Sequence, residues 1–214
     1  MPESYAVQSE RLFRYERYLR HFGFRLITGV DEAGRGPLAG PVVAAAVILP
    51  PDVRIAGLRD SKLLTARQRD ALFAEIRSVA VAVGVGMVGP RTIDRINIRR
   101  ATFLAMHRAL LRLGVEPELV VVDGELVPDL PFAERAFVKA DRRVAAVAAA
   151  SVVAKVTRDR IMDRLDARFP GYGFSEHKGY PTPGHLAALA ALGPSPVHRL
   201  SFGPCRRLSQ DRAV

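Results

Sequence analysis

The sequence contains little cysteine, little lysine and no long apolar run, and each shortage argues against a class of protein. Cys205 is the only cysteine, so no disulfide can form within the chain, which agrees with a reducing cytoplasm. The histidines also lack zinc-site spacing, so we expect no zinc site. No apolar run reaches the roughly 18 residues of a membrane-spanning helix, and the first 20 residues do not resemble a signal peptide. We therefore expect a cytoplasmic protein that does not enter a membrane.

Lysine is scarce in a chain that is otherwise strongly basic. Of the 32 basic residues four are lysines, and the formal net charge is +10. Such an excess attracts polyanions, so nucleic acid is the expected partner. An acidic membrane and a small substrate are the alternatives, although the basic residues are not gathered on one amphipathic helix. Lysine and arginine are not interchangeable at a binding site, so a retained lysine can indicate a specific chemical role.

The pattern of apolar residues predicts an α/β protein. Hydrophobic residues make up 49% of the 214 residues, enough for one sizeable core. Short apolar segments predict strands at 26–30, 41–49, 79–88, 119–123 and 136–140. Periodicity and capping signals predict helices at 7–20, 65–79, 97–113, 143–168 and 182–193. Their order predicts a mixed central sheet flanked by helices, followed by a basic tail laid over the body.

The most informative segment follows the first predicted strand. Asp31 and Glu32 end that strand, and Gly34, Arg35 and Gly36 come next. Neighbouring side chains on a strand point to opposite faces, so both carboxylates can bind one metal only if the strand becomes irregular there. The glycines permit this and let backbone N–H groups approach a phosphate. A simple polar turn after a core strand is the alternative.

Two further aspartates lie near the ends of other predicted strands. Asp123 ends the fourth strand, at the edge where open α/β sheets bind ligands. Asp141 precedes the helix at 143–168, so it is a second carboxylate of this kind, a helix N-cap, or both. Carboxylates suit Mg²⁺ or Mn²⁺, which would relieve their mutual repulsion. Asp159, in the middle of the same helix, is expected on a solvated face with i,i+4 pairing.

Tyr180 lies in a loop punctuated by glycine and proline and flanked by basic side chains. An aromatic ring in this setting can stack on a sugar or a base, or it can pack beneath its own loop. The residues alone do not choose between these two interpretations.

Six motifs occur in one order along the chain and together resemble those of bacterial ribonuclease HII, a type 2 ribonuclease H family. They are Gly29–Gly40, Asp60–Lys62, Val122–Gly124, Ala149–Asp159, His177–Thr182 and His198–Pro204. The resemblance runs from about residue 26 to residue 207 and implies an RNase H-like fold. It divides the chain into an N-terminal helical segment (1–25), a catalytic domain (26–170) and a packed C-terminal loop, helix and basic tail (171–214).

The resemblance also implies an activity and a metal cofactor. Members cleave RNA in RNA–DNA hybrids and cut at single ribonucleotides in duplex DNA, using Mn²⁺ or Mg²⁺. The family's catalytic and metal-binding carboxylates correspond to Asp31, Glu32, Asp123 and Asp141. The fourth follows a Lys-Gly pair in the family, whereas this chain has Ala140 in place of the glycine.

The same resemblance predicts how substrate is bound. The family's Gly-Arg-Gly motif, here Gly34, Arg35 and Gly36, contacts the ribonucleotide and its 2′-hydroxyl. The family's loop tyrosine, here Tyr180, stacks on the following deoxyribose. We expect Lys62 to help Arg35 position phosphate or sugar.

Two other functions are compatible with parts of this pattern. A different carboxylate nuclease of the same fold, such as a junction resolvase, would cleave substrates made only of DNA. A non-catalytic nucleic-acid-binding module would bind without forming product, but clustered carboxylates would oppose that binding. We expect the protein to be a monomer.

Overall fold

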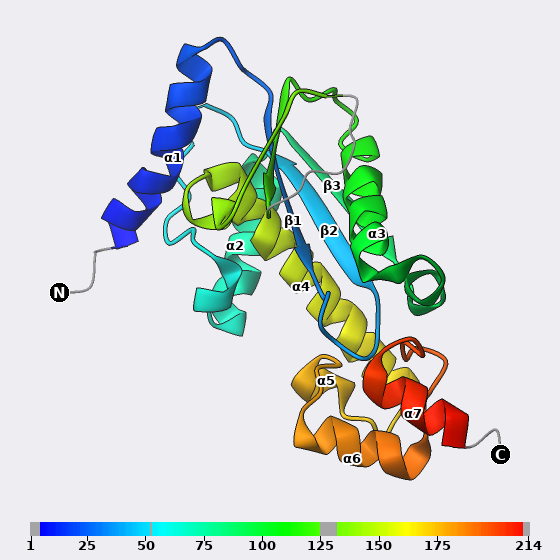
Figure 1. The fold of residues 1–214 in the computed structure, drawn as a ribbon. Coiled ribbons are helices and arrows are strands. Elements are labelled where there is room, and N and C mark those ends of the chain that lie inside the picture. The colour runs from blue at the N-terminus through cyan, green and yellow to red at the C-terminus, as the bar shows by residue number, and fades with distance from the viewer. Residues whose placement is uncertain (1–4, 52, 125–131, 212–214) are drawn as a thin grey trace.

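The computed structural model describes residues 5–51, 53–124 and 132–211 (Figure 1). The main elements are α1 (Tyr5–His21), β1 (Ile27–Ala33), β2 (Val42–Ile48), α2 (Ala66–Val79), β3 (Ala82–Val88), α3 (Pro90–Leu111), β4 (Leu119–Asp123), β5 (Glu134–Phe137), α4 (Ala145–Arg168), α5 (Phe174–His177), α6 (Pro183–Leu192) and α7 (Gly203–Asp211). Two short 3₁₀ turns, η1 (Ser61–Leu63) and η2 (Ala140–Arg142), precede α2 and α4.

The five strands form one sheet in the order β3-β2-β1-β4-β5. β1 pairs with β2 in antiparallel register and with β4 in parallel register. The predicted mixed sheet flanked by helices is therefore confirmed. β1 lies at the centre, and its neighbour β4 runs in the same direction, so the carboxyl ends of these two strands meet at one edge.

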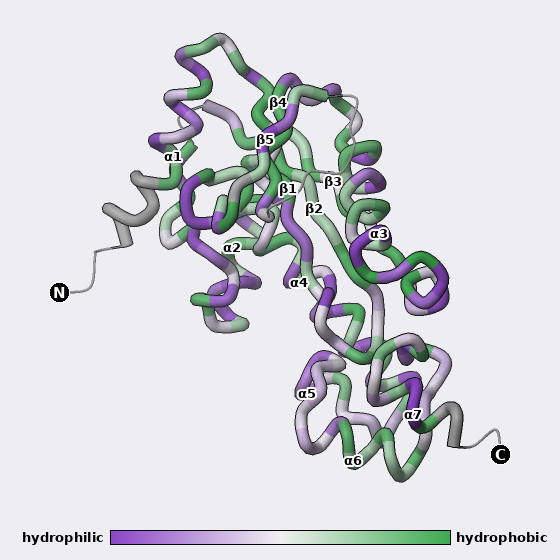
Figure 2. The backbone as a smooth tube through the Cα atoms, viewed as in Figure 1, coloured by the Kyte–Doolittle hydropathy of each residue, from purple (hydrophilic) through white to green (hydrophobic). Residues whose placement is uncertain are grey.

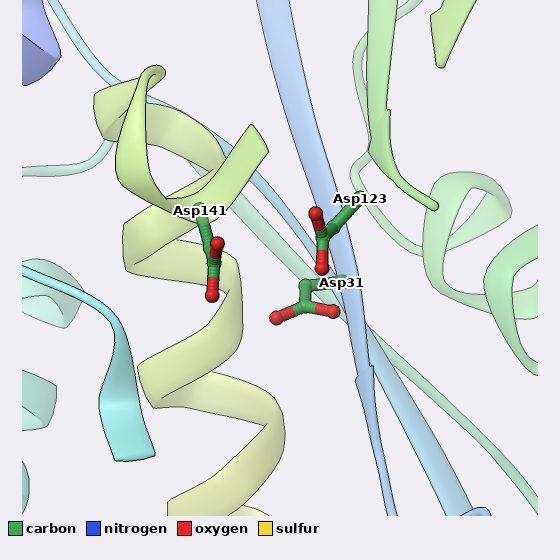
Figure 3. A group of neighbouring side chains, drawn as sticks. All are labelled: Asp31, Asp123 and Asp141. Carbon is green, nitrogen blue, oxygen red and sulfur yellow. The ribbon is translucent and has the colours of Figure 1, made fainter. Parts of the chain in front are cut away.

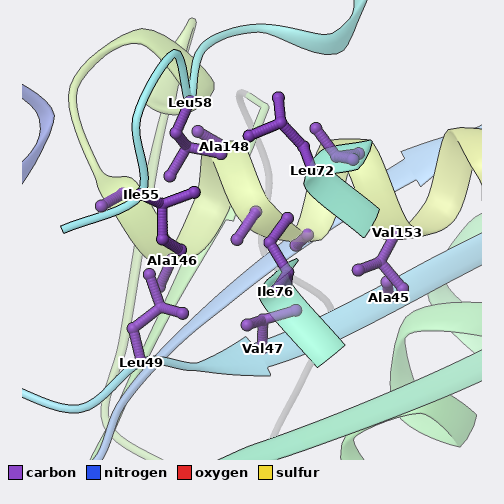
Figure 4. Packing of buried hydrophobic residues seen from close by; sticks show 14 of the residues in the cluster. Ala45, Val47, Leu49, Ile55, Leu58, Leu72, Ile76, Ala146, Ala148 and Val153 are labelled. Carbon is purple, nitrogen blue, oxygen red and sulfur yellow. The ribbon is translucent and has the colours of Figure 1, made fainter. Parts of the chain in front are cut away.

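The two faces of the sheet are covered by different helices (Figure 1). Ala45 and Val47 of β2 pack with the alanine-rich first half of α4 and with α2 (Figure 4). Ala44 and Ala46, which alternate with them, pack on the other face against α3. Hydrophobic residues follow much of the sheet, whereas α1 is largely hydrophilic (Figure 2). No helix among the described residues is both long enough and apolar enough to cross a bilayer.

Several element boundaries differ from the predicted ones. α3 begins at Pro90 rather than 97, and it kinks at Asn97, whose φ is 66°. The fifth strand ends at Phe137, because the following residues form η2. The capping box predicted at Thr65 is confirmed.

Asp159 does not lie on a solvated face. Its side chain is 16% exposed, and its carboxylate accepts a hydrogen bond of 2.6 Å from Nζ of Lys155. The guanidinium of Arg69, at the start of α2, lies 3.8 Å away. The predicted i,i+4 pairing is therefore present, in the form of the Lys155–Asp159 pair. The predicted solvated face was wrong because α2 packs on this side of α4, which helical periodicity alone could not reveal.

The C-terminal part of the chain is more ordered than a surface tail. α5, α6 and α7 gather at the far end of α4, away from α1 (Figure 1). Before α7, His198 is only 2% and Arg199 0% exposed. Polar residues among prolines suggested a superficial course, but these side chains turn inward and contact the loop after β1.

Gly29 of β1 allows α4 to approach the sheet closely. A Cβ at this position would lie 2.1 Å from the carbonyl carbon of Ala146 and from the backbone nitrogen of Val147. No side chain can move to relieve such an overlap, because both atoms belong to the helix backbone. The first turn of α4 is therefore held directly against β1, two residues before Asp31.

We expect Gly29→Ala to destabilise the protein by about 3 kcal/mol, because β1 and α4 must separate to admit the methyl group. Urea denaturation measures this change. Gly184→Ala in α6 is the matched control, since a Cβ there meets nothing within 4 Å. Equal stability of the two variants would contradict the close packing.

Glu16 caps α4 from another helix. Val144 precedes α4 and provides no side-chain cap, while Oε1 of Glu16 in α1 accepts a hydrogen bond of 2.6 Å from the N–H of Ala146. Glu16 is 3% exposed, and this burial raises its pKa from 4.5 to about 7. A buried carboxyl group thus joins α1 to the helix that covers the sheet.

The raised pKa of Glu16 predicts a pH-dependent stability. The native state holds the proton of Glu16 more tightly than the unfolded state does. The stabilisation that this protonated carboxyl group provides is therefore fully present below pH 4.5 and is lost as the pH rises through about 7. Glu16→Gln keeps an oxygen acceptor without the charge. Relative to wild type, we expect it to gain roughly 3 kcal/mol between pH 4.5 and pH 8, measured by urea denaturation. A pH-independent difference would contradict this assignment.

Candidate functional site

Three aspartates converge at the edge of the sheet where β1 and β4 end. Asp31 comes from β1, Asp123 from the end of β4 and Asp141 from η2 (Figure 3). Each offers a carboxylate oxygen, and these three oxygens lie within 4.8 Å of one another. The parallel pairing of β1 with β4 brings the first two together, as the strand-end argument predicted.

Glu32 lies on the opposite face of β1 from this group. β1 pairs regularly with β2 as far as Ala33, and Asp31 lies opposite Ala45 whereas Glu32 lies opposite Ala44. Ala45 packs on the α4 side and Ala44 on the α3 side. The expected irregularity is therefore absent from this pairing, and a metal role for Glu32 stays a prediction.

The environment of Asp31 and Asp141 disfavours the ionisation of these two carboxyl groups. Burial raises the pKa of Asp31 well above its usual value, and the charges of Glu32 and Asp123 raise it further. Burial, followed by the charges of Asp123 and Asp60, raises the pKa of Asp141 to about 6. A divalent cation would remove this repulsion, and carboxylate oxygens are the ligands that Mg²⁺ and Mn²⁺ prefer. The donor set therefore fits such an ion.

Asp141 does not cap α4. It lies in η2, and α4 begins only after Val144, so the N-cap interpretation was wrong. The N–H of Ala140 donates a hydrogen bond of 2.7 Å to Oδ1 of Asp123, which holds η2 against the end of β4. The left-handed residue here is Lys139, with φ at 61°, so alanine at position 140 causes no backbone strain.

Lys62 brings a positive charge to the same place. Oδ1 of Asp60 accepts a hydrogen bond of 2.9 Å from the N–H of Lys62 and so shapes η1. Burial alone would lower the pKa of Lys62, but the charges of Asp60, Asp31 and Asp141 raise it above its usual value. Asp60 was not among the predicted site residues. An aspartate two residues before the lysine is the signal, since it is typical of an Asx turn.

The loop after β1 lies beside Tyr180. Gly34 has a φ of 94°, which a side chain rarely adopts, and a Cβ there would lie 2.0 Å from Nε of Arg158. A Cβ on Gly36 would lie 3.6 Å from Cε1 of Tyr180, so loop and ring are in contact distance. The ring is 43% exposed, so it does not pack beneath its own loop. Nη1 of Arg35 donates to Oε1 of Glu32 at 3.3 Å.

Two buried arginines support this loop, and the sequence analysis missed both. The guanidinium of Arg199 donates to the carbonyls of Gly34, Arg35 and Gly40 at distances of 2.6–3.0 Å. That of Arg158 donates to the carbonyls of Pro41, Ala39 and Lys178 at 3.0–3.2 Å. Burial lowers the pKa of Arg199 to about 9. Both lie in two of the six motifs, but Arg158 is one of several arginines in the charged second half of α4, so its burial had no local signal.

Comparison with known proteins assigns this architecture to a family. The family model described as ribonuclease HII matches residues 28–205, which include every predicted site residue. The chain belongs to the ribonuclease HII family. It is therefore a ribonuclease H and a hydrolase, as the six motifs predicted.

Individual ribonucleases show how far the similarity extends. Ribonuclease HII of Geobacillus kaustophilus is 53% identical over 93% of this chain and 76% of its own length. Ribonuclease HII of Geobacter sulfurreducens is 54% identical over 89% of this chain and 88% of its own. The crystal structure of ribonuclease H2 from Pyrococcus horikoshii OT3 covers 86% of this chain and 97% of its own, with 28% identity and a TM-score of 0.72. The predicted RNase H-like fold is confirmed.

The carboxylate cluster predicts that Asp141→Asn stabilises the protein without metal but removes most of the stabilisation that Mn²⁺ provides. Without metal, we expect Asp141→Asn to stabilise the protein at pH 8 by about 1 kcal/mol, or roughly 2–4 °C, because a buried charge is removed. Mn²⁺ should raise the melting temperature of wild type and have a much smaller effect on the variant. Differential scanning fluorimetry measures both. Asp70→Asn, at an exposed position on α2, is the control and should keep the Mn²⁺ response.

Proposed function

We propose that this protein hydrolyses RNA in RNA–DNA hybrids and cuts duplex DNA on the 5′ side of a single embedded ribonucleotide. The products would carry 5′-phosphate and 3′-hydroxyl ends. The observation that supports this most is the contact distance between Tyr180 and Gly36, beside a cluster of three carboxylates. Groups suited to reading one nucleotide thus lie next to groups suited to hydrolysing its phosphate.

Asp31, Asp123 and Asp141 would hold the catalytic Mn²⁺ or Mg²⁺, and we propose Glu32 as the fourth ligand. Two such ions would activate a water for in-line attack and stabilise negative charge on the departing 3′-oxygen. The protein contributes a prearranged ligand set, because β1, β4 and η2 already hold the three aspartates together.

Substrate recognition would come from the loop and the tyrosine. The backbone around Gly34 and Gly36 would hydrogen-bond the ribonucleotide, including the 2′-hydroxyl that distinguishes RNA from DNA. The exposed ring of Tyr180 would stack on the next deoxyribose. Lys62 interacts electrostatically with the clustered aspartates, and it would contact the phosphate together with Arg35.

The surplus of arginine would add affinity that does not depend on sequence. A formal net charge of +10 suits the phosphate backbones of a duplex, and binding would weaken as salt rises. We further propose that the protein acts as a monomer in the cytoplasm. Residues 26–170 would form the catalytic domain, with 1–25 and 171–214 as its N-terminal and C-terminal additions.

The two rival functions receive less support. A nuclease for all-DNA substrates would have no need of the 2′-hydroxyl contact that we propose for the loop. A binding module without catalysis would keep three clustered carboxylates, whose charge opposes the approach of a phosphate.

A cleavage assay tests the proposal. The substrate is duplex DNA with one ribonucleotide, compared with the same duplex made only of DNA. With Mn²⁺ or Mg²⁺ we expect one cut on the 5′ side of the ribonucleotide, and none with a chelator. We expect Asp123→Asn to lower kcat/KM at least about a hundredfold, because several kcal/mol of charge stabilisation are lost.

Two outcomes would refute the proposal. Equal cleavage of the all-DNA duplex would favour another nuclease of this fold. Duplex binding without product in either metal would favour a binding module. Asp70→Asn, outside the cluster, should cleave as wild type does.

A further inference from the structure

We propose that segment 195–199, in which Ser195, His198 and Arg199 are buried, is a positioning element for both sides of the ribonucleotide contact. It would hold the 34–36 loop through Arg199, and Tyr180 through His198 and His185. This inference rests on the proposed function, because it assigns those two sides to substrate. It adds residues that do not touch substrate themselves, and it gives the C-terminal part of the chain a role in specificity.

A chain of hydrogen bonds links this segment to Tyr180. Nδ1 of His198 accepts from the N–H of Ser195 at 2.9 Å. Nε2 of His198 lies 3.1 Å from Nε2 of His185, and Nδ1 of His185 lies 2.9 Å from the carbonyl oxygen of Tyr180. The backbone groups at the two ends determine where the protons are. His198 must carry its proton on Nε2 and donate it to His185, which must carry its own on Nδ1 and donate it to Tyr180.

The surroundings keep both rings neutral, as this arrangement requires. His185 is 0% and His198 2% exposed. Burial lowers the pKa of His185, and it lowers the pKa of His198 to about 4, with the neighbouring His185 adding to the effect. The rings of Tyr172 and Phe174 pack against His198. At neutral pH the chain of donors is therefore intact.

Besides the histidine chain, backbone hydrogen bonds at the start of α6 and in the preceding loop hold Tyr180. Thr182 caps α6 by accepting from the N–H of His185, and its own N–H donates to the carbonyl of Tyr180 at 2.8 Å. The N–H of Tyr180 donates to the carbonyl of His177 at 2.9 Å. The backbone of the tyrosine is thus held at both N–H and carbonyl while its ring stays exposed.

Arg199, the next residue along, supports the opposite side. Its side chain donates to the carbonyls of Gly34, Arg35 and Gly40, and its N–H donates to the carbonyl of Leu38 at 2.8 Å. Burying a guanidinium among carbonyls is costly unless its hydrogen bonds are well made. The planar fork defines the course of the whole 34–40 loop in a way that a lysine could not.

Arg199 and the histidine chain together set the distance between the 34–36 loop and the ring of Tyr180. A Cβ at Gly36 would be only 3.6 Å from the ring of Tyr180, so a small shift of either would change the gap between them. Displacements of about 1 Å can cost a hundredfold in rate or binding when a site must match one nucleotide. Two adjacent buried residues, His198 and Arg199, hold the two sides, which keeps the gap constant.

Matched substitutions of His185 test the histidine chain. The amide nitrogen of asparagine can take the place of Nδ1 and donate to Tyr180, whereas glutamine places its amide near Nε2 and leaves that carbonyl without this donor. For the ribonucleotide duplex we expect His185→Gln to raise KM about tenfold with little change in kcat, and His185→Asn to recover most of the loss. His107→Gln, in α3, is the control.

A double-mutant cycle shows whether His185 acts through Tyr180. In the Tyr180→Ala background, His185→Gln should change KM less than twofold, because the group that it positions is gone. Additive effects would overturn the proposal and indicate a general structural role. So would equal KM values for the two His185 variants.

Arg199→Lys tests the other side. We expect a rise of about tenfold in KM for the ribonucleotide duplex and an unchanged Kd for the all-DNA duplex, because the charge is kept and the fork is lost. A parallel loss of affinity for both duplexes would count against a role in specificity. Arg207→Lys in α7 is the control.

A measurement without substrate separates this inference from the proposed function. In ¹⁵N-histidine spectra of the full chain between pH 6 and 8, His185 should carry its proton on Nδ1 and His198 on Nε2, with neither ring titrating. The opposite tautomers, or titration near pH 6.5, would overturn the histidine chain. If wild type cleaved no ribonucleotide duplex while these tautomers were found, the proposed function would fail and the hydrogen-bond chain would remain.

Discussion

The close contact between β1 and the first turn of α4 is the constraint on which the rest of the structure depends. Gly29 leaves no atom between strand and helix, and the alanines of α4 continue the contact along the sheet. This contact places η2, which leads into α4, beside the end of β4. Asp141 therefore reaches Asp31 and Asp123 only because the helix lies so near the strand. Glu16 adds a cap at the same turn.

The three clustered aspartates are electrostatically unfavourable, and basic side chains lie around them. Three carboxylates are held closer than their repulsion favours, and burial reduces the screening that water would provide. Lys62 offsets part of this charge, and Arg142 pairs with Asp60 nearby at 3.2 Å. Such a cluster costs stability in the protein alone, and a divalent cation bound to it would restore that stability. Stability and metal affinity are thus linked through the same side chains.

Buried arginines shape the loop after β1. Arg158 and Arg199 bind its backbone carbonyls from α4 and from the segment before α7. These main-chain hydrogen bonds add to the burial of Leu38 and Ala39 in fixing the course of the loop. The C-terminal part of the chain contributes to this loop through Arg199, although it supplies none of the three clustered carboxylates.

Much could be read from the sequence because local signals were strong. The apolar strands, the capping box at Thr65 and the six motifs determined the fold class, the family and the aspartates at the strand ends. Local patterns could not show which face Glu32 takes, because that depends on the regular pairing of β1 with β2. Nor could they show that Asp159 is covered by α2, or that His198 and Arg199 turn inward. By itself the sequence determined which chemical groups are present and their order along the chain. Only the tertiary structure decided which of them meet, because packing brings together residues more than a hundred positions apart.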